Sequence, residues 1–340
     1  MATDMGVDLG TATVLIYLKG KGIVLHEPSV VAIEQNTMQV LAVGESAQRM
    51  LGRTPGNIVA TRPLRDGVIA DFDITEIMLR HFIRKVCDRR HIFKPRIVVC
   101  IPGGTTSVEQ KAVIDALTRT GAREAYLIEE PRAAALGAGL EIFQPSGNMI
   151  IDVGGGTTDV AVMSLGEVVV SNSIRVGGDK FDASIIRYIK NHHNLLIGER
   201  TAEDLKIAVS SAYPGNRNVS KAIRGRDLVS GLPRSIEFST PMLMEAIEEP
   251  LSQIIRCIRQ VLEKTPPELA GDIISNGIFL TGGGALLDGL SQRITKETEV
   301  PTFLAEDPVS CVARGTGKTL ELLDRLSESL ISSKKVAAAN

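Results

Sequence analysis

The sequence predicts an α/β protein made of two related halves, because one short pattern occurs twice and strands alternate with helices between its copies. The first copy, 5–18, is an apolar run ending near Asp8, then a turn of small residues and a second apolar run. The second copy, 149–162, has the same plan around Asp152, which follows Asp8 by 152 − 8 = 144 residues. A repeat over nearly half the chain indicates an internal duplication.

Each copy of the pattern predicts a β-hairpin. Residues 96–101 have the apolar character of a buried strand, and a helix is expected after the Pro-Gly-Gly turn that follows. Ser107 and Gln110 fit a capping box at the start of this helix, and Gly121 ends it. Its apolar face is expected to consist of Val108, Ala112, Val113, Ala116 and Leu117.

The later elements continue the alternation. A strand is expected at 125–128, with a helix starting near Pro131, the position that favours proline. Another strand, 278–281, leads through three glycines to a helix expected from Ala285. The apolar residues of 251–262 predict a buried helix face. Together these elements predict a sheet covered by helices.

Composition limits the function classes. The 340 residues suggest about two domains, and 38 Lys and Arg against 40 Asp and Glu give no basic field for nucleic acid. No signal peptide or apolar run of about 18 residues is evident, so a cytoplasmic rather than an integral membrane protein is expected. The residues from Ser332 onward are expected to form a frayed tail.

Three patterns resemble known sites but lack an essential feature. The four cysteines are far apart with no Cys-x-x-Cys pair, which argues against zinc and against a disulfide framework. His192 and His193 have no partner at ligand spacing and are expected in a polar loop. The segment 315–319 resembles the end of a Walker A loop, but Val312 replaces its first glycine, so it predicts a C-terminal helix instead.

Three glycine-rich turns, 10–12, 154–156 and 282–284, each follow an apolar strand. Glycine lets backbone N–H groups approach phosphate oxygens closely. Asp8 and Asp152 precede two of these turns, and across a cleft their carboxylates would repel unless Mg²⁺ and its waters lay between them. The turns and acids therefore predict a magnesium–nucleotide site between the halves.

These motifs resemble those of the actin, Hsp70 and sugar-kinase superfamily. Its two phosphate loops look like 8–13 and 152–159, and its adenosine motif looks like 281–290. The sequence is similar to the bacterial MreB family, that is MreB or a close paralogue such as Mbl or MreBH. The similar segments are 27–32, 54–56, 65–71, 128–131, 178–182 and 224–227. This resemblance implies an α/β actin-like fold, with two duplicated ribonuclease H-like lobes around a nucleotide cleft.

The resemblance also implies site residues for ATP, ADP and Mg²⁺. Phosphate-binding backbone groups are implied at Thr11, Ala12, Thr13, Gly154, Gly155 and Gly156. Asp8 and Asp152 would hold Mg²⁺ through water and, with Glu130 and assistance from Thr157, position the attacking water. The ribose and adenine walls are implied to be Glu203, Asp204, Leu205, Lys206, Gly283, Gly284, Ala285 and Leu286.

Some of these residues have simpler interpretations. Glu129 and Glu130 also fit a solvated pair, and Lys206 a surface residue. Thr13 replaces an Asn that is common in the family, so its grip on phosphate is expected to change modestly.

A second feature points to a membrane surface. Ile92 and Phe93 lie in an expected loop among many cations, with Asp88 the single acid of that stretch. The cations are Arg80, Arg84, Lys85, Arg89, Arg90, Lys94 and Arg96. Apolar side chains among cations suit an anionic bilayer, and MreB relatives contact membranes with a loop at this place. Alternatively, Phe93 packs on the protein and the charges are solvated.

The resemblance implies an ATPase, producing ADP and phosphate, whose ATP-bound form assembles into filaments, with paired protofilaments expected. The filaments would lie under the plasma membrane and organise cell-wall synthesis with partners such as RodZ and MreC/MreD, which maintains rod shape. A small-molecule kinase, which needs substrate-binding insertions, and a chaperone-type ATPase, which needs a peptide-binding domain after Leu330, are the alternatives.

The resemblance further implies four subdomains. They are expected to be subdomain IA at 1–30, 67–142 and 308–340, IB at 31–66, IIA at 143–181 and 241–307, and IIB at 182–240.

Overall fold

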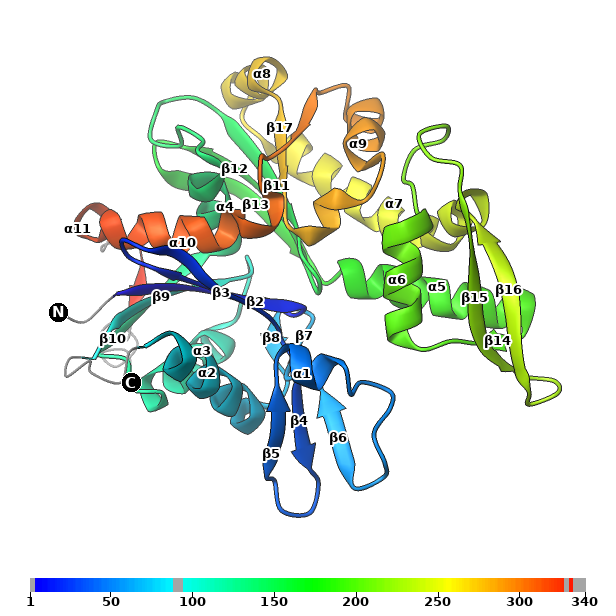
Figure 1. Cartoon of the computed structure of the whole chain (residues 1–340). Coiled ribbons are helices and arrows are strands. Elements are labelled where there is room, and N and C mark those ends of the chain that lie inside the picture. Colours follow the sequence, from blue (N-terminus) through cyan, green and yellow to red (C-terminus); the bar gives the residue numbers. More distant parts are fainter. Residues whose placement is uncertain (1–3, 88–93, 327–329, 333–340) are drawn as a thin grey trace.

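The computed structural model describes residues 4–87, 94–326 and 330–332, which form two lobes, each built around one large sheet (Figure 1). The sheet of the first lobe has the strand order β19-β10-β9-β1-β2-β3. Its strands are β1 (Met5–Leu9), β2 (Thr13–Leu18), β3 (Gly22–Pro28), β9 (Arg96–Ile101), β10 (Glu124–Glu129) and β19 (Ile331–Ser332).

The sheet of the second lobe has the order β13-β12-β11-β17-β18. Its strands are β11 (Asn148–Val153), β12 (Thr158–Ser164), β13 (Glu167–Ile174), β17 (Ile278–Thr281) and β18 (Thr302–Leu304). In both sheets three consecutive antiparallel strands end with the central strand, β1 or β11, and the next two strands run parallel to it.

The two sheets also share their register, which confirms the internal duplication. Met5 pairs with Ile97 in the first lobe, and Met149, 144 residues further on (149 − 5), pairs with Ile278 in the second. The hairpin turns match as well. The backbone N–H of residue 10 donates to the carbonyl of residue 13 at 3.1 Å, and that of residue 154 to residue 157 at 2.9 Å.

Helices α4 (Glu130–Ala138) and α10 (Cys311–Glu321) lie between the two sheets (Figure 1). Their backbones cross so closely that only glycine fits. A Cβ on Gly137 would lie 1.7 Å from the Cys311 carbonyl oxygen, and one on Gly315 would lie 1.7 Å from that of Ala133. The segment 315–319 is thus helical, as predicted, and its first glycine serves packing.

The remaining helices cover the outer faces of the sheets and the far end of the second lobe. They are α2 (Phe72–Val86), α3 (Ser107–Arg119), α5 (Gly178–His193), α6 (Glu199–Val209), α7 (Thr240–Lys264), α8 (Pro267–Asn276), α9 (Leu290–Thr298) and α11 (Leu323–Leu326), with the 3₁₀ turns η1 (Gly283–Leu286) and η2 (Pro308–Ser310). The predicted apolar face of 251–262 is buried on α7, for example at Ile254 and Ile258. No helix in the described part of the chain is long and apolar enough to cross a bilayer.

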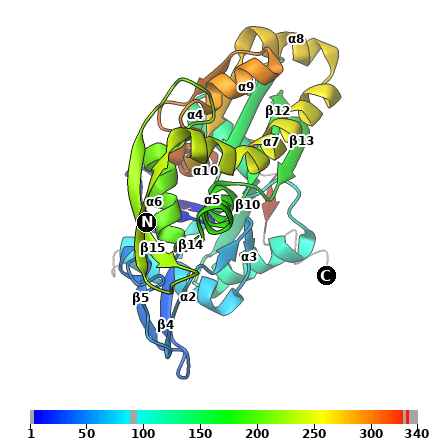
Figure 2. The same cartoon turned by 90° about the vertical axis from the view of Figure 1, so that its right-hand side faces the viewer.

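Each lobe also carries a small outer sheet. In the first lobe β5 (Val40–Val43), β4 (Val31–Glu34) and β6 (Ile58–Thr61) lie beside α1 (Glu45–Gln48), and β7 (Leu64–Arg65) pairs with β8 (Val68–Ile69). In the second lobe β14 (Leu195–Leu196), β15 (Ser220–Asp227) and β16 (Pro233–Ser239) flank α5 and α6 (Figure 2). The opening between the lobes lies between these outer parts.

The start of α3 differs from the prediction by one residue. Thr106, not Ser107, is the N-cap: its Oγ1 accepts from the Glu109 N–H, and the Glu109 carboxylate accepts from the Thr106 N–H at 2.8 Å. Val108, expected on the buried face, is 77% exposed. Eight residues separate it from buried Ala116, and at 3.6 residues per turn this rotates Val108 by roughly 80° away from the core.

Three further expectations about local structure were wrong. After 282–284 the chain forms the 3₁₀ turn η1, and α9 starts only after Gly289, whose φ of 73° interrupts a helix. Ser332 of β19 pairs with Tyr126 of β10, so the expected tail does not begin at Ser332, while the rest of it, 333–340, lies outside the described residues. His192 and His193 end helix α5, where the His192 ring stacks on Tyr188 with centroids 4.0 Å apart.

Candidate active site

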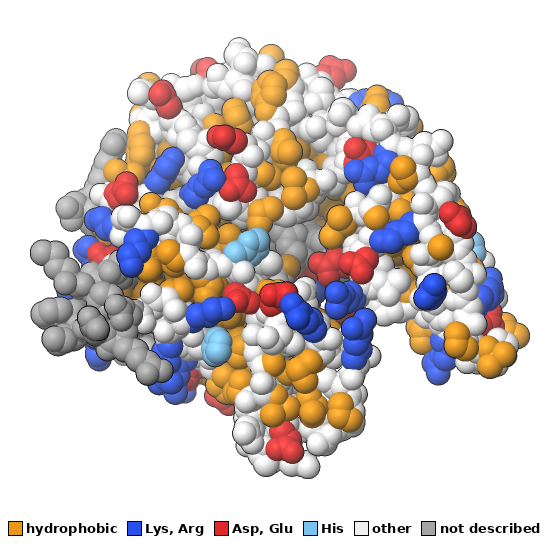
Figure 3. Space-filling view, in the orientation of Figure 1, with side chains coloured by type: hydrophobic (Ala, Val, Ile, Leu, Met, Phe, Trp, Pro, Cys, Tyr) orange, Lys and Arg blue, Asp and Glu red, His pale blue; other side chains and the backbone are white. Residues whose placement is uncertain are grey.

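A cavity of about 360 Å³ lies between the lobes, within the range of small-molecule sites. Figure 3 shows the hollow from outside, with acidic and basic side chains close together at its lower rim. The cavity is lined by both hairpin turns, by the β17–η1 turn, and by residues of α5 and α6. The structure therefore brings together the three glycine-rich turns that the sequence analysis singled out.

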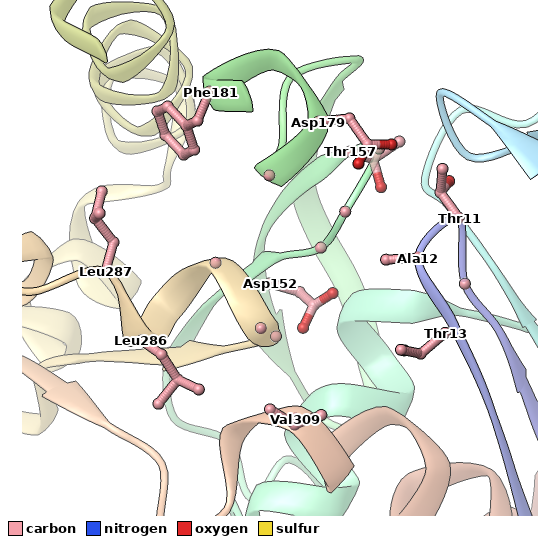
Figure 4. Close-up of a pocket in the computed structure, with 18 of the residues that line it drawn as sticks. Thr11, Ala12, Thr13, Asp152, Thr157, Asp179, Phe181, Leu286, Leu287 and Val309 are labelled. Carbon is pink, nitrogen blue, oxygen red and sulfur yellow. The ribbon is translucent and has the colours of Figure 1, made fainter. Parts of the chain in front are cut away.

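The two hairpin turns approach each other across the cavity. A Cβ on Gly155 would lie 2.7 Å from the Ala12 Cβ, and one on Gly156 would lie 2.5 Å from the Thr11 Oγ1. Figure 4 shows Thr11 to Thr13 on one side and Thr157 with Asp152 on the other. The glycines keep this gap narrow and free of side chains, as a site for a polyanion bound by backbone groups requires.

Asp8 and Asp152 both line the cavity, at the ends of the equivalent strands β1 and β11. Burial, with the nearby Asp152 charge, raises the pKa of Asp8 to about 7. Burial raises the pKa of Asp152 to about 6, against the lowering effect of a hydrogen bond from Thr281. Two desolvated carboxylates in one cavity form a place where a divalent cation is favoured.

Glu130 is buried at the start of α4, so it is not half of a solvated pair, although Glu129 beside it is exposed. Burial and then the charges of Asp159, Asp152 and Asp8 raise the pKa of Glu130 well above its usual value. A carboxyl held in this way keeps its proton more readily than an exposed one, a property common among groups that transfer protons in reactions.

Asp159 was not predicted as a site residue. It is 1% exposed, and its Oδ1 accepts a 2.6 Å hydrogen bond from the Gly103 N–H of the first lobe. Burial raises its pKa to about 7. The duplication could have marked it, because its counterpart in the first lobe is Leu15 (159 − 144), so the second lobe has an acid where the first has a core residue.

One face of α6 forms a wall of the cavity through Glu203, Lys206, Ile207 and Ser210, the spacing of a single helix stripe. Lys206 is not a free surface residue, since its Nζ donates to Asp182 Oδ2 at 2.9 Å and to the Gly178 carbonyl at 3.1 Å.

Three residues of the predicted adenosine walls do not line the cavity. Helical periodicity turns Asp204 to solvent and Leu205 into the core, away from the stripe of Glu203 and Lys206. Ala285 is also buried in the core, whereas its neighbours Gly283, Gly284 and Leu286 line the cavity.

One side of the cavity is apolar. Figure 4 shows Phe181, Leu287 and Leu286 along the side of the cavity opposite Thr11 to Thr13, with Val309 below Asp152. The lining residues that the sequence analysis did not name individually as site residues are Leu9, Gly10, Gly67, Gly178, Asp179, Phe181, Asp182, Ile207, Ser210, Gly282, Leu287, Asp288, Val309 and Val312. A polar, cation-favouring end and an apolar end match a nucleotide, with phosphates at one end and a base at the other.

Ion pairs between the lobes flank the cavity. Arg62 of the first lobe lies 3.6 Å from the Asp179 carboxylate and 3.9 Å from that of Glu203, both cavity residues of the second lobe. Asp66 lies 3.9 Å from the Lys180 ammonium. The segment 62–66 therefore faces the start of α5 with charges of opposite sign.

The family model "MreB/Mbl protein" matches residues 2–328 of this sequence. The chain belongs to the MreB/Mbl family. Among its relatives, the cell shape-determining protein Mbl of Bacillus subtilis is 57% identical over 331 residues, covering 97% of this chain and 99% of Mbl. The cell shape-determining protein MreB of Escherichia coli is 51% identical, covering 97% of both chains.

Solved structures agree with this MreB/Mbl assignment. MreB5 of Spiroplasma citri bound to AMPPNP superimposes with a TM-score of 0.91 at 39% identity, covering 97% of this chain and 99% of MreB5. The MamK double helical filament gives a TM-score of 0.81 at 20% identity, covering 94% and 98%, and shows the fold alone. The actin-like fold expected from the resemblance is thus confirmed.

Two sequence expectations concern other parts of this MreB/Mbl chain. Ile92 and Phe93, the expected membrane loop, lie outside the described residues. Among the residues that the structure describes, no cluster of three or more His, Cys, Asp or Glu could hold a metal directly.

Proposed function

We propose that this chain binds ATP in the cavity between its lobes, hydrolyses it to ADP and phosphate, and polymerises in the ATP-bound state into filaments that determine cell shape. The observation that carries the proposal is the pair of equivalent hairpins, each with an aspartate, that face each other across the cavity. The AMPPNP and ADP bound to MreB5 of Spiroplasma citri support it.

In this proposal the hairpin turns bind the phosphates, through backbone N–H groups of Thr11–Thr13 and Gly154–Gly156. Asp8 and Asp152 would hold Mg²⁺ through water, and the ion would supply positive charge to neutralise the phosphates. Glu130 orients the attacking water and accepts its proton, with Thr157 assisting at the facing turn. Burial of Glu130 and, after it, the nearby Asp159 charge raise the pKa of Glu130.

Glu203 and Lys206 of α6 and the turn Gly283–Leu286 hold the ribose and adenine, and Phe181 and Leu287 extend the apolar wall. Asp204, Leu205 and Ala285 act only by placing these neighbours, since their own side chains lie outside the cavity. Thr13 offers a hydroxyl where an amide is common, which changes the phosphate contact modestly.

The subdomain boundaries expected from the sequence belong to the same proposal. The outer segments 31–66 and 182–240 would form subdomains IB and IIB on either side of the opening, and IA and IIA would contain the two large sheets. The filaments, with paired protofilaments, would lie at the inner face of the plasma membrane beside partners such as RodZ and MreC/MreD.

Assembly is expected to need both ATP and Mg²⁺. Light scattering should rise after both are added, and electron microscopy should show filaments. The reason is that closure of the lobes on ATP favours the subunit shape that polymerises. ADP with Mg²⁺ serves as the comparison. Turnover stimulated by a sugar, without filaments, would instead identify a small-molecule kinase.

Membrane binding is expected to depend on residues 92 and 93. The double substitution Ile92→Ser and Phe93→Ser should abolish pelleting with anionic liposomes, because each buried apolar side chain contributes about 1.5–3 kcal/mol, repeated along a filament. The matched control is Leu165→Ser with Val169→Ser, two exposed apolar residues elsewhere. Unchanged pelleting of the 92/93 variant would refute this role.

A further inference from the structure

The two cavity aspartates are held in the same way in both lobes. Thr281 lies opposite Asp152 on the neighbouring parallel strand β17, and its Oγ1 donates to Asp152 Oδ1 at 2.7 Å. On β9 of the first lobe, the register that pairs Val7 with Val99 continues to place Cys100 opposite Asp8. The Cys100 Sγ donates to Asp8 Oδ1 at 3.4 Å.

Both donors belong to the interior of their sheets. Thr281 is 0% exposed and Cys100 is 3% exposed, and neither side chain lines the cavity, whereas both aspartates do. Each donor thus makes a hydrogen bond to one carboxylate oxygen from outside the cavity lining and leaves the other oxygen free to face the cavity. Figure 4 shows the Asp152 carboxylate there. Hydrogen bonds of this kind fix the orientation of groups that bind a metal or its waters.

We propose that Cys100 and Thr281 are a matched pair of positioning residues that orient Asp8 and Asp152 toward hydrated Mg²⁺ and ATP. This inference rests on the proposed function and names two residues outside the cavity that control its acids. The pair is unequal, since a hydroxyl at 2.7 Å is a much stronger donor than a thiol at 3.4 Å. Asp152 is therefore held more firmly than Asp8, and the loss of the Thr281 hydroxyl should weaken Mg²⁺ binding more than the loss of the Cys100 thiol.

The test measures the Mg²⁺ concentration that gives half-maximal binding of a fluorescent ATP analogue, without reference to turnover. Thr281→Val removes the hydroxyl at nearly constant shape and should raise this concentration about 10–100-fold. Binding of the analogue in EDTA should stay at the wild-type level. Thr281→Ser keeps the donor and should stay within about 3-fold of wild type, because the hydroxyl rather than the methyl group positions Asp152.

The first lobe gives an independent measurement. Cys100→Ala should raise the half-maximal Mg²⁺ concentration by less than Thr281→Val does, and Cys100→Ser, with a stronger donor, should leave it unchanged or lower it. If Thr281→Val fails to fold, the comparison of these two variants still decides the proposal.

Matched controls separate positioning from a general loss of packing. Thr319 is equally buried, but its hydroxyl donates to the Gly315 carbonyl within α10, and the buried Cys257 donates its thiol hydrogen to the Asn172 carbonyl rather than to Asp8 or Asp152. Thr319→Val and Cys257→Ala should lower thermal stability without moving the Mg²⁺ response.

Three results would overturn the inference: a wild-type Mg²⁺ response in Thr281→Val, an equal loss in Thr281→Ser, or an equal loss in Thr319→Val. Failure of the proposed function has a different signature, since wild-type protein would then not bind the analogue at any Mg²⁺ concentration.

Discussion

Glu130→Gln is expected to slow phosphate release from ATP about 10²–10⁴-fold, the usual contribution of a positioned acid or base. Gln has nearly the same shape but cannot accept the proton of the attacking water. Nucleotide affinity should stay close to wild type, because Glu130 lies at the start of α4 rather than in a phosphate-binding turn. Phosphate release and equilibrium binding of a fluorescent ATP analogue measure the two effects separately.

Folding should survive this substitution, since the raised pKa of Glu130 shows that its charge is disfavoured where it lies. Without nucleotide, the melting temperature of the variant should therefore be at least as high as that of the wild type. Glu129→Gln, at the exposed neighbouring position, is the matched control and should turn over ATP normally. Wild-type turnover by Glu130→Gln would remove Glu130 from the chemistry.

The second large effect is expected at Gly315. An Ala Cβ there would lie 1.7 Å from the Ala133 carbonyl oxygen, a backbone atom that no rotamer change can move away. Helices α4 and α10 would have to separate, so Gly315→Ala should lower the free energy of unfolding by about 3 kcal/mol, the upper part of the range for overpacking. Chemical denaturation followed by circular dichroism measures this loss.

Gly271→Ala is the matched control for the same chemical change. Gly271 lies within helix α8, and a Cβ there would meet no atom within 4 Å. This substitution should raise the free energy of unfolding by about 0.5–1 kcal/mol, because alanine favours a helix over glycine. Equal stability of the two variants would mean that α4 and α10 are not packed as described.

The sequence patterns were most informative where the chemistry is local. An aspartate, a turn of small residues and two apolar runs define each hairpin within about fourteen residues, so Asp8, Asp152 and their turns could be located before the fold was known. The same holds for Pro131, which marked the start of α4 within one residue.

The parts of the site that were missed depend on distant contacts. Asp159 belongs to a segment that was noted, but its role depends on Gly103 and Glu130, which reach it from the other lobe. Treating 203–206 as one continuous motif ignored helix geometry, which sends Leu205 into the core between two cavity residues. The apolar wall combines α5, η1 and η2, which only the tertiary fold brings together.

The two ends of the cleft are held by forces of different kinds. At its base α4 and α10 meet through glycine backbones, a steric contact that dissolved ions do not alter. At its mouth Arg62 faces Asp179 and Glu203 across 3.6 and 3.9 Å, with side chains that are 16%, 39% and 33% exposed. Ions screen partly exposed charges, with a Debye length of about 10 Å at 0.1 M salt. A higher salt concentration should therefore weaken the ion pairs that hold the two lobes together at the opening of the cleft, while the contact between α4 and α10 at its base stays the same.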